Sequence, residues 1–328
     1  MEFQSAALEA LPASEIEPWM SKLNDVHDRV IRRAISLSER KLMDEGIGPS
    51  PCSYAFVLFG SGGRKEQTLW SDQDNGIIFG PVDPIREQEA ERYFQQMGNA
   101  ISEGLELAGY PPCEGKVLVS NPDWRKSVHE WEKTLDKWFS EPDWEHVRYL
   151  LIAADMRCVY GNEKLADQVR KYFFDSIYAD ERVITHMLHN TLRHKVTMNI
   201  FGHLVKERYG EDAGGVEIKY AAYIPMVNAV RLLSIIAGIN ETSTLKRLDG
   251  LFGDRRFPED QLEQWKQAFL LILRMRMRTD SYEQNGFFVS NGMIRAEDLS
   301  KQMTNDLKFC LHSAKNLQRF VKKIVPDR

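Results

Sequence analysis

Asp72 and Asp74 are the residues of this sequence whose type and spacing most directly suggest chemistry. They precede the apolar stretch Ile77 to Phe79, which indicates a strand, and residues two apart in a strand project from the same face. Two carboxylates roughly 5 Å apart repel each other by about 3 kcal/mol at an effective dielectric constant of about 20. A bound cation removes this repulsion, and magnesium prefers oxygen ligands, typically carboxylates together with the phosphates of a substrate. The pair therefore predicts a magnesium site.

A glycine-rich turn, Gly60 to Gly63, begins twelve residues before Asp72. It directly follows the apolar run Ala55 to Phe59, which is short enough to be a buried strand. Glycines let the chain turn tightly and let its N–H groups approach a triphosphate closely. Arg64 to Leu69 has the length of about two helical turns. We therefore expect the order strand, glycine turn, short helix, strand, with a phosphate-binding turn and a metal site in one unit.

The motif made of residues 60–67 (GSGGRKEQ) and 71–75 (SDQDN) resembles the active-site motif of the DNA polymerase β-like nucleotidyltransferases. It looks most like the GlnD-like members of that superfamily, many of which are fused to CBS domains. The resemblance implies an α+β fold: a polymerase β-like nucleotidyltransferase domain with an N-terminal helix, followed by an all-helical bundle domain. It also implies transfer of a nucleoside monophosphate from an NTP, ATP or UTP, to a hydroxyl of a protein or small-molecule acceptor in signalling or regulation.

The resemblance assigns roles to individual residues of the motif. Asp72 and Asp74 would be catalytic and would hold two magnesium ions, or manganese in their place. Gly60, Ser61 and Gly62 would bind the phosphates of the nucleotide, and Arg64 would neutralise charge on the departing pyrophosphate. Glu66 and Gln67 would orient Arg64 or a metal-bound water.

A third carboxylate is usual on a later strand in the family that the motif resembles. The candidate strand Lys116 to Val119 contains no acidic residue, so Asp155 is the first candidate, with Glu114 and Asp123 behind it. The alternative is that Asp155 has a structural role, either in an ion pair with Arg157 or as a cap. Both interpretations of Asp155 stay open at the level of the sequence.

The elements that must position this motif are mostly helices. We expect a nucleotidyltransferase domain over residues 1–162, with an amphipathic helix at 14–44 and a catalytic core at 50–162. His27 is expected on the exposed side of the first helix. Within the core, helices are predicted at 85–107, around Trp131 and Trp138, and from 144 to 162. The turn at 120–127 (SNPDWRKS) also resembles the family, whereas residues 113–116 (CEGK) depart from its Cys-Pro-Gly-Gly.

Residues 163–328 show helical periodicity without a further strand pattern. Helices are predicted at 165–178, 182–209, 220–238, 243–251, 259–282 and 296–324. Residues 218–220, 225–233 and 240–248 resemble the helical substrate-binding domain of the same family. No CBS or cyclic-nucleotide-binding module is recognised, so sensing of a ligand by such a module would come from a separate sensor protein.

Composition excludes several other classes of protein. A net charge of −5 and a pI near 6.0 disfavour a general nucleic-acid binder. No apolar stretch approaches the roughly 20 residues that span a bilayer, so we expect no membrane partner and a cytoplasmic location. The cysteines, Cys52, Cys113, Cys158 and Cys310, form no metal-binding pattern and are expected to be small buried hydrophobic residues. A catalytically inactive module that senses nucleotides is the alternative function.

Overall fold

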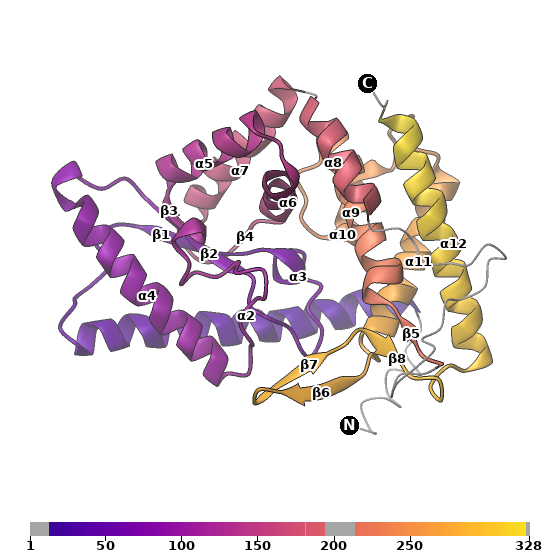
Figure 1. Cartoon of the computed structure of the whole chain (residues 1–328), viewed down its shortest axis with the longest axis horizontal. Coiled ribbons are helices and arrows are strands. Elements are labelled where there is room, and N and C mark those ends of the chain that lie inside the picture. The colour runs from indigo at the N-terminus through magenta and orange to yellow at the C-terminus, as the bar shows by residue number, and fades with distance from the viewer. Residues whose placement is uncertain (1–12, 181, 194–213, 326–328) are drawn as a thin grey trace. The chain divides into compact units, whose positions relative to one another are not determined.

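The computed structural model describes residues 13–180, 182–193 and 214–325, which form two compact units. One unit, called here the sheet unit, consists of Lys22–Asp180 together with Gln284–Val289. The other, called the helical unit, consists of the remaining described residues. Figure 1 shows the elements of both. Among the described helices, none combines the length and the apolar character that a membrane span requires.

Four strands form the sheet of the sheet unit, in the order β3-β2-β1-β4. Strand β1 pairs antiparallel with β2 and with β4, whereas β2 pairs in parallel with β3. In the first of these pairs Leu58 lies opposite Asn75, so the end of β1 meets the beginning of β2. The strand bounds are Tyr54–Leu58 (β1), Asn75–Phe79 (β2), Arg125–Ser127 (β3) and Arg157–Gly161 (β4). This register brings the glycine turn and the two aspartates to one edge of the sheet.

Helices cover both faces of this sheet. Helices α2 (Ala13–Asp44) and α4 (Glu87–Leu107) contribute to one hydrophobic core with alternate residues of β1 and β2. Helices α5 (Val128–Ser140) and α7 (Glu163–Ala179) contact the strands from the other side, as Figure 1 shows. Every residue of β1 and β2 is consequently buried, which explains why both strands are apolar runs rather than alternating patterns. Because α7 packs on β1 and β4, the sheet unit continues to Asp180.

The helix predicted at Arg64 to Leu69 is wrong. The helical turn lies earlier, as α3 (Gly60–Gly63), and the residues from Glu66 to Thr68 form neither helix nor strand. Lys65 has a φ of 57°, a left-handed conformation that stops a helix. Two turns of helix therefore cannot start at Arg64.

The strand predicted at Lys116 to Val119 is also not formed, because β3 occupies the place beside β2. Val117 and Val119 instead hydrogen-bond to Asn75 at the start of β2. The helix predicted from 144 to 162 ends early, as α6 (Trp144–Ala153), and the chain continues as β4. The reason is tertiary: the free edge of β1 accepts residues 157–161 as a strand.

Helix α2 agrees with the predicted amphipathic helix, but the expectation that His27 is exposed is wrong. The His27 side chain is only 7% exposed. Its Nε2 lies 2.9 Å from the carbonyl oxygen of Thr68, and its Nδ1 lies 2.7 Å from the hydroxyl of Tyr110. The sequence pattern of the helix misses this burial because the covering residues lie 41 and 83 positions further along the chain.

The helical unit contains helices close to those predicted, and also short strands. Its helices are α8 (Arg182–Arg193), a π-helical turn Lys219–Tyr223 that leads into α9 (Ile224–Ile236), α10 (Thr244–Leu251), α11 (Glu259–Arg276) and α12 (Lys301–Ile324). Its strands are β5 (Val216–Glu217) and β8 (Met293–Ile294), which pair with each other. Between α11 and β8 the chain forms a hairpin of β6 (Ser281–Gln284) and β7 (Phe287–Ser290), of which residues 284–289 belong to the sheet unit.

These strands correct the expectation of an all-helical C-terminal domain. The hairpin shortens the helix predicted to reach residue 282, because the chain is already extended from Ser281. The part of the predicted 182–209 helix after Arg193 lies outside the described residues.

The buried His27 makes stability depend on pH. Burial lowers the pKa of His27 below its usual 6.5, and the Thr68 carbonyl and Asp28 only partly oppose this effect. Below pH 6.5 the unfolded chain binds a proton that the folded chain does not, so the free energy of unfolding should fall as the pH falls from 6.5 toward the lowered pKa. Urea unfolding of His27→Gln should show a shallower loss between pH 7 and 5 than the wild type. Exposed His129→Gln is the control, and equal slopes for all three proteins would contradict the assignment.

Candidate active site

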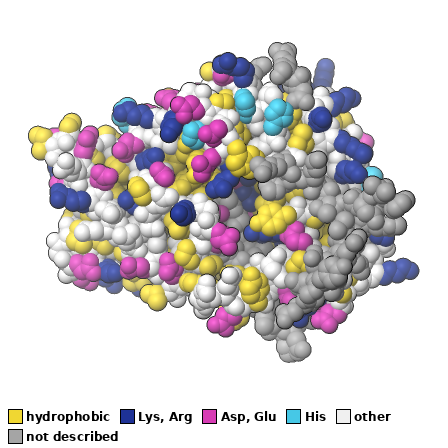
Figure 2. Space-filling view, viewed as in Figure 1, with side chains coloured by type: hydrophobic (Ala, Val, Ile, Leu, Met, Phe, Trp, Pro, Cys, Tyr) yellow, Lys and Arg dark blue, Asp and Glu magenta, His cyan; other side chains and the backbone are white. Residues whose placement is uncertain are grey.

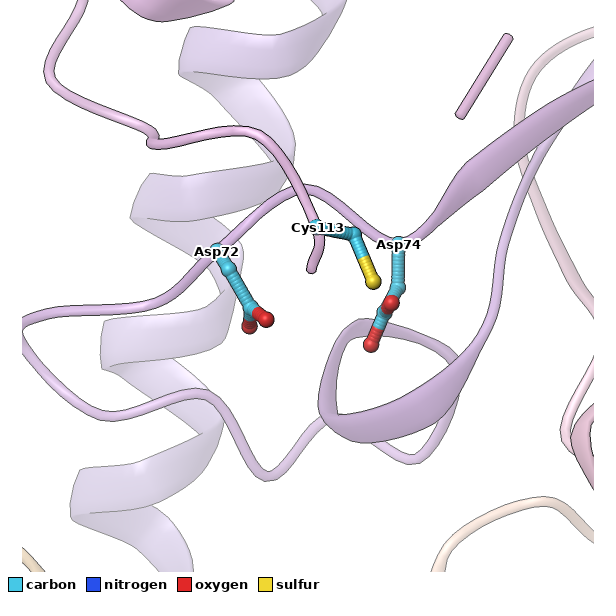
Figure 3. Close-up of side chains that lie close together, drawn as sticks. All are labelled: Asp72, Asp74 and Cys113. Carbon is cyan, nitrogen blue, oxygen red and sulfur yellow. The ribbon is translucent and has the colours of Figure 1, made fainter. Parts of the chain in front are cut away.

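Asp72 and Asp74 lie in the extended segment that leads into β2, one residue apart on either side of Gln73. Gln73 is buried, and its side-chain amide donates hydrogen bonds to the carbonyl oxygens of Ser102 and Tyr110. Because neighbouring residues of an extended chain point in opposite directions, this anchor turns both aspartates the other way. Figure 3 shows the two carboxylates pointing to the same side of their segment. The predicted shared face is therefore confirmed, although β2 itself begins only at Asn75.

Cys113 joins the two aspartates. One ligand atom each from Asp72, Asp74 and Cys113 lie within 4.8 Å of one another. Burial raises the pKa of the Cys113 thiol, as do the charge of Asp74 and the hydrogen bond that the thiol makes to it. Magnesium and manganese prefer oxygen ligands to the soft sulfur of a thiol. The oxygen atoms of the cluster come from the two carboxylates.

The place of Cys113 corrects the expectation that it is a small buried hydrophobic residue, since it is only half-buried. The loop that carries it is tied to the start of β2, where Asn75 donates from its backbone to Val117 and accepts from the backbone of Val119. Sequence reasoning missed this residue because it lies 39 positions after Asp74 and has no metal-binding spacing. The available indication was that Cys113 keeps the first residue of the family's Cys-Pro-Gly-Gly, although two of the three residues after it differ from that pattern.

The glycine turn lies against Asp74. A side chain at Gly60 would overlap the carboxylate of Asp74, and the φ of Gly60 is +51°. The backbone N–H of Phe59 donates to the Asp74 carbonyl at 2.9 Å, which fixes the turn to the aspartate segment. Gly60, Ser61 and Gly62 form the first turn of α3, whose N–H groups have no partner within the helix itself. The turn therefore offers backbone donors beside the carboxylate cluster.

Arg64 lies beneath the turn and is only 4% exposed. Its Nε donates to Glu66 at 2.9 Å, and its Nη1 donates to Asp155 at 2.5 Å. Asp155 lies two residues before the start of β4 and is fully buried. A side chain at Gly63 would overlap the Asp155 carbonyl oxygen. The Arg64, Glu66 and Asp155 side chains thus form one buried ionic network, called here the Arg64 network, that supports the turn from below.

The alternative prediction, a structural ion pair between Asp155 and Arg157, is right about the ion pair and wrong about the partner. Asp155 does form an ion pair, but its partner is Arg64. Arg157 instead pairs with Asp28 on α2, at 2.8 Å, and donates to the carbonyl oxygen of Gly62. Both arginines therefore hold the glycine turn, one through carboxylates and one through the backbone.

Neither of the other candidates for a third carboxylate joins the cluster. Glu114 and Asp123 are exposed. Over residues 13–180, 182–193 and 214–325, the cluster that could hold a cation contains only Asp72, Asp74 and Cys113. The structure therefore brings together two of the three predicted carboxylates.

Gln67 and α2 hold the segment between turn and aspartates. The backbone N–H of Gln67 donates to Asn24 Oδ1 at 3.0 Å, and Asn24 Nδ2 donates to the Gln67 carbonyl at 3.3 Å. Gln67 is 3% exposed and lines a small cavity together with Gly62, Asp72 and Asp74. Its place is behind the cluster, where it positions the backbone.

Comparison with known families agrees with this geometry. Residues 6–145 match the family model described as Putative nucleotidyltransferase DUF294. Residues 181–325 match the model described as Putative nucleotidyltransferase substrate binding domain. The chain therefore contains the two domains that these models describe. The first match includes the glycine turn, Asp72, Asp74 and Cys113 but ends before Asp155. Among curated proteins, none matches the chain.

The contact between Gly60 and Asp74 predicts a defect in metal binding. Gly60→Ala should move the Asp74 carboxylate and weaken binding of Mn²⁺, a spectroscopic substitute for Mg²⁺, by about tenfold, because one of two carboxylate ligands is displaced. Electron paramagnetic resonance of free Mn²⁺ measures this affinity. Gly46→Ala is the matched control, since Gly46 also has a positive φ but has open space around it. Equal Mn²⁺ affinity in the two variants would refute the placement of Asp74 in the metal site.

The Arg64 network predicts a loss of stability. Arg64→Met removes the cation that lies between the buried Glu66 and Asp155 carboxylates, which should lower the free energy of unfolding by about 3 to 5 kcal/mol. Urea denaturation gives this value. The neighbouring Lys65→Met is the control, because Lys65 pairs with Asp25 at the surface and should change stability by less than about 1 kcal/mol. A loss in Arg64→Met no larger than in the control would contradict the role of the network.

Proposed function

We propose that the chain is a metal-dependent nucleotidyltransferase that transfers a nucleoside monophosphate from an NTP to a hydroxyl group, with pyrophosphate leaving. The observation that carries this proposal is the convergence of Asp72 and Asp74 beside the first turn of α3. A carboxylate pair next to unpaired backbone donors suits a nucleotide triphosphate that arrives with divalent cations. The family models support the same reaction class.

The donor set of the cluster fits magnesium or manganese. Asp72 and Asp74 would supply the oxygen ligands, because they are close together and point to the same side. When bound, two such ions would activate the attacking hydroxyl and neutralise charge on the leaving oxygen. Cys113 would act through Asp74, since its thiol lies beside that carboxylate and would limit the orientations that the carboxylate can adopt.

The glycine turn would bind the phosphates of the nucleotide, and the Arg64 network would hold the turn in position. The backbone N–H groups of Gly60, Ser61 and Gly62 would bind phosphate oxygens of the NTP. Arg64 was expected to contact the departing pyrophosphate, but its burial and its two carboxylate partners favour a positioning role instead. The same argument makes Glu66, Gln67 and Asp155 positioning residues.

The acceptor would be a protein or a small molecule, and the nucleotide would be ATP or UTP. Figure 2 shows acidic and basic side chains interspersed on the described part of the face in view, rather than one broad basic stripe. Together with the net charge of −5, this supports an acceptor other than nucleic acid. A substrate-binding domain in residues 181–325 supports an acceptor site outside the sheet unit.

A nucleotide-sensing module without catalysis is the second candidate. It is favoured by one observation: Asp155 is held in the Arg64 network, so the cluster formed by the described residues has two carboxylates and no third. Such a module would bind an NTP with magnesium at the same turn and pass the signal to a partner protein.

One comparison separates the two candidates. Wild-type chain and Asp74→Asn are incubated in cell lysate with Mg²⁺ and each of four α-³²P-labelled NTPs, and label on an acceptor is measured. We expect label with ATP or UTP in the wild type, and a loss of at least about 100-fold in the variant because a metal ligand is gone. Asp175→Asn, an exposed aspartate of α7, is the control and should keep full activity.

The thermal midpoints of these variants complete the test. Full labelling by Asp74→Asn with an unchanged midpoint would refute the metal assignment. Tight, Mg²⁺-dependent binding of NTP by the wild type without any labelled acceptor would favour the sensing module.

A further inference from the structure

Two adjoining cavities lie along β3 and α5 in the sheet unit. The larger has a volume of about 900 Å³ and the smaller of about 350 Å³. Four residues line both of them: Asp123, Lys126, Lys133 and Thr134. Neither cavity is lined by Asp72, Asp74 or the glycine turn, so this place is separate from the candidate active site.

Lys126 lies where the two cavities meet. It is the middle residue of β3, the strand at one end of the sheet order, and it is half-buried. Its ammonium group donates to the Thr134 hydroxyl at 2.9 Å, and that hydroxyl in turn donates to the Glu130 carbonyl at 2.7 Å. A lysine ammonium has three donors, so a single hydroxyl acceptor leaves it incompletely satisfied.

The electrostatic surroundings of Lys126 add to this deficit. Burial lowers its pKa, the nearby charge of Lys137 acts in the same direction, and the charges of Asp123 and Glu130 act against it. In the described part of the chain no carboxylate lies within 4.0 Å of the Lys126 ammonium. A partly desolvated cation without a close counter-ion is stabilised when an anion binds beside it.

Further cations line the smaller cavity. Lys133 and Lys137 are four residues apart on α5 and therefore lie on one face of that helix, next to Thr134. His146 also lines this cavity, together with the aromatic side chains of Trp124, Trp138 and Tyr149, which contact one another. Asp123 and Glu145 are exposed at its border. The arrangement is an aromatic-walled hollow with three lysines.

We propose that the smaller cavity binds a small phosphorylated molecule, with its phosphate group held by Lys126, Lys133 and Lys137. A phosphate group offers several acceptor oxygens and up to two negative charges, so it can contact more than one of the lysines that line this cavity, whereas a single carboxylate offers fewer acceptors and one charge. The volume of about 350 Å³ is that of a site for a small molecule. The proposal is independent of nucleotidyl transfer, because it uses no residue of the candidate active site.

Calorimetric titration of the full chain with inorganic phosphate, and separately with tripolyphosphate, tests this site. EDTA is present, so divalent cations at Asp72 and Asp74 make no contribution. We expect saturable binding of phosphate, tighter binding of tripolyphosphate, and binding of both at least about tenfold weaker in Lys126→Met, as the loss of one charge-assisted contact predicts. Wild-type affinity in a folded Lys126→Met, or no detectable binding of either probe by the wild type, would overturn the proposal.

Three further variants keep the result unambiguous. Lys133→Met removes a cation from the rim of the cavity and should also weaken binding, which covers the case in which Lys126→Met does not fold. Lys171→Met, an exposed lysine of α7 outside both cavities, should bind like the wild type. Asp74→Asn should bind like the wild type too, so a failure of the proposed transferase reaction leaves this test intact. Equal weakening in all lysine variants would show general charge attraction and would overturn the site.

Discussion

The burial of one guanidinium group between two carboxylates determines how the sheet unit presents its functional face. Arg64 follows the glycine turn directly, and its partners Glu66 and Asp155 come from the adjoining segment and from the connection between α6 and β4. A buried cation of this kind is tolerated only when its partners are in place. The backbone of the turn is consequently held in one position relative to β4, and Arg157 reinforces this position through Asp28 and Gly62.

The aspartate segment is fixed by neutral hydrogen bonds. Gln73 bonds to carbonyl groups of α4 and of the residues that follow it, and Asn75 bonds to the loop that carries Cys113. On the α2 side, His27 links Tyr110 to Thr68. Asp74 consequently lies between two anchored residues, Gln73 and Asn75, and Asp72 is next to the first of them. A site that must hold a charged ligand benefits from such anchoring, because the ligands need not be ordered again at each binding event.

The sequence permitted a correct prediction of the parts whose causes are local. The apolar runs at 55–59 and 77–79 became β1 and β2, the long helix became α2, and Asp72 and Asp74 share one face as their spacing requires. The errors concern residues whose state depends on distant partners. Arg64 and Asp155 are buried against each other although they lie 91 positions apart, and His27 is buried against Tyr110, 83 positions away. Strands β3 and β4 form because the edges of β2 and β1 are available for pairing. Cys113 belongs to the same group, since a loop 39 residues further along the chain delivers it to Asp74.

The glycines of the turn have a consequence for how the protein could change over evolutionary time. At Gly60 a side chain would meet the Asp74 carboxylate, and at Gly63 it would meet the backbone of Asp155 and Leu58. The surface offered at these positions is therefore main chain, whose chemistry is the same in every sequence that keeps the conformation. A side chain placed at Gly60 or Gly63 would therefore change the backbone conformation of the turn before it could add any new chemistry to its surface.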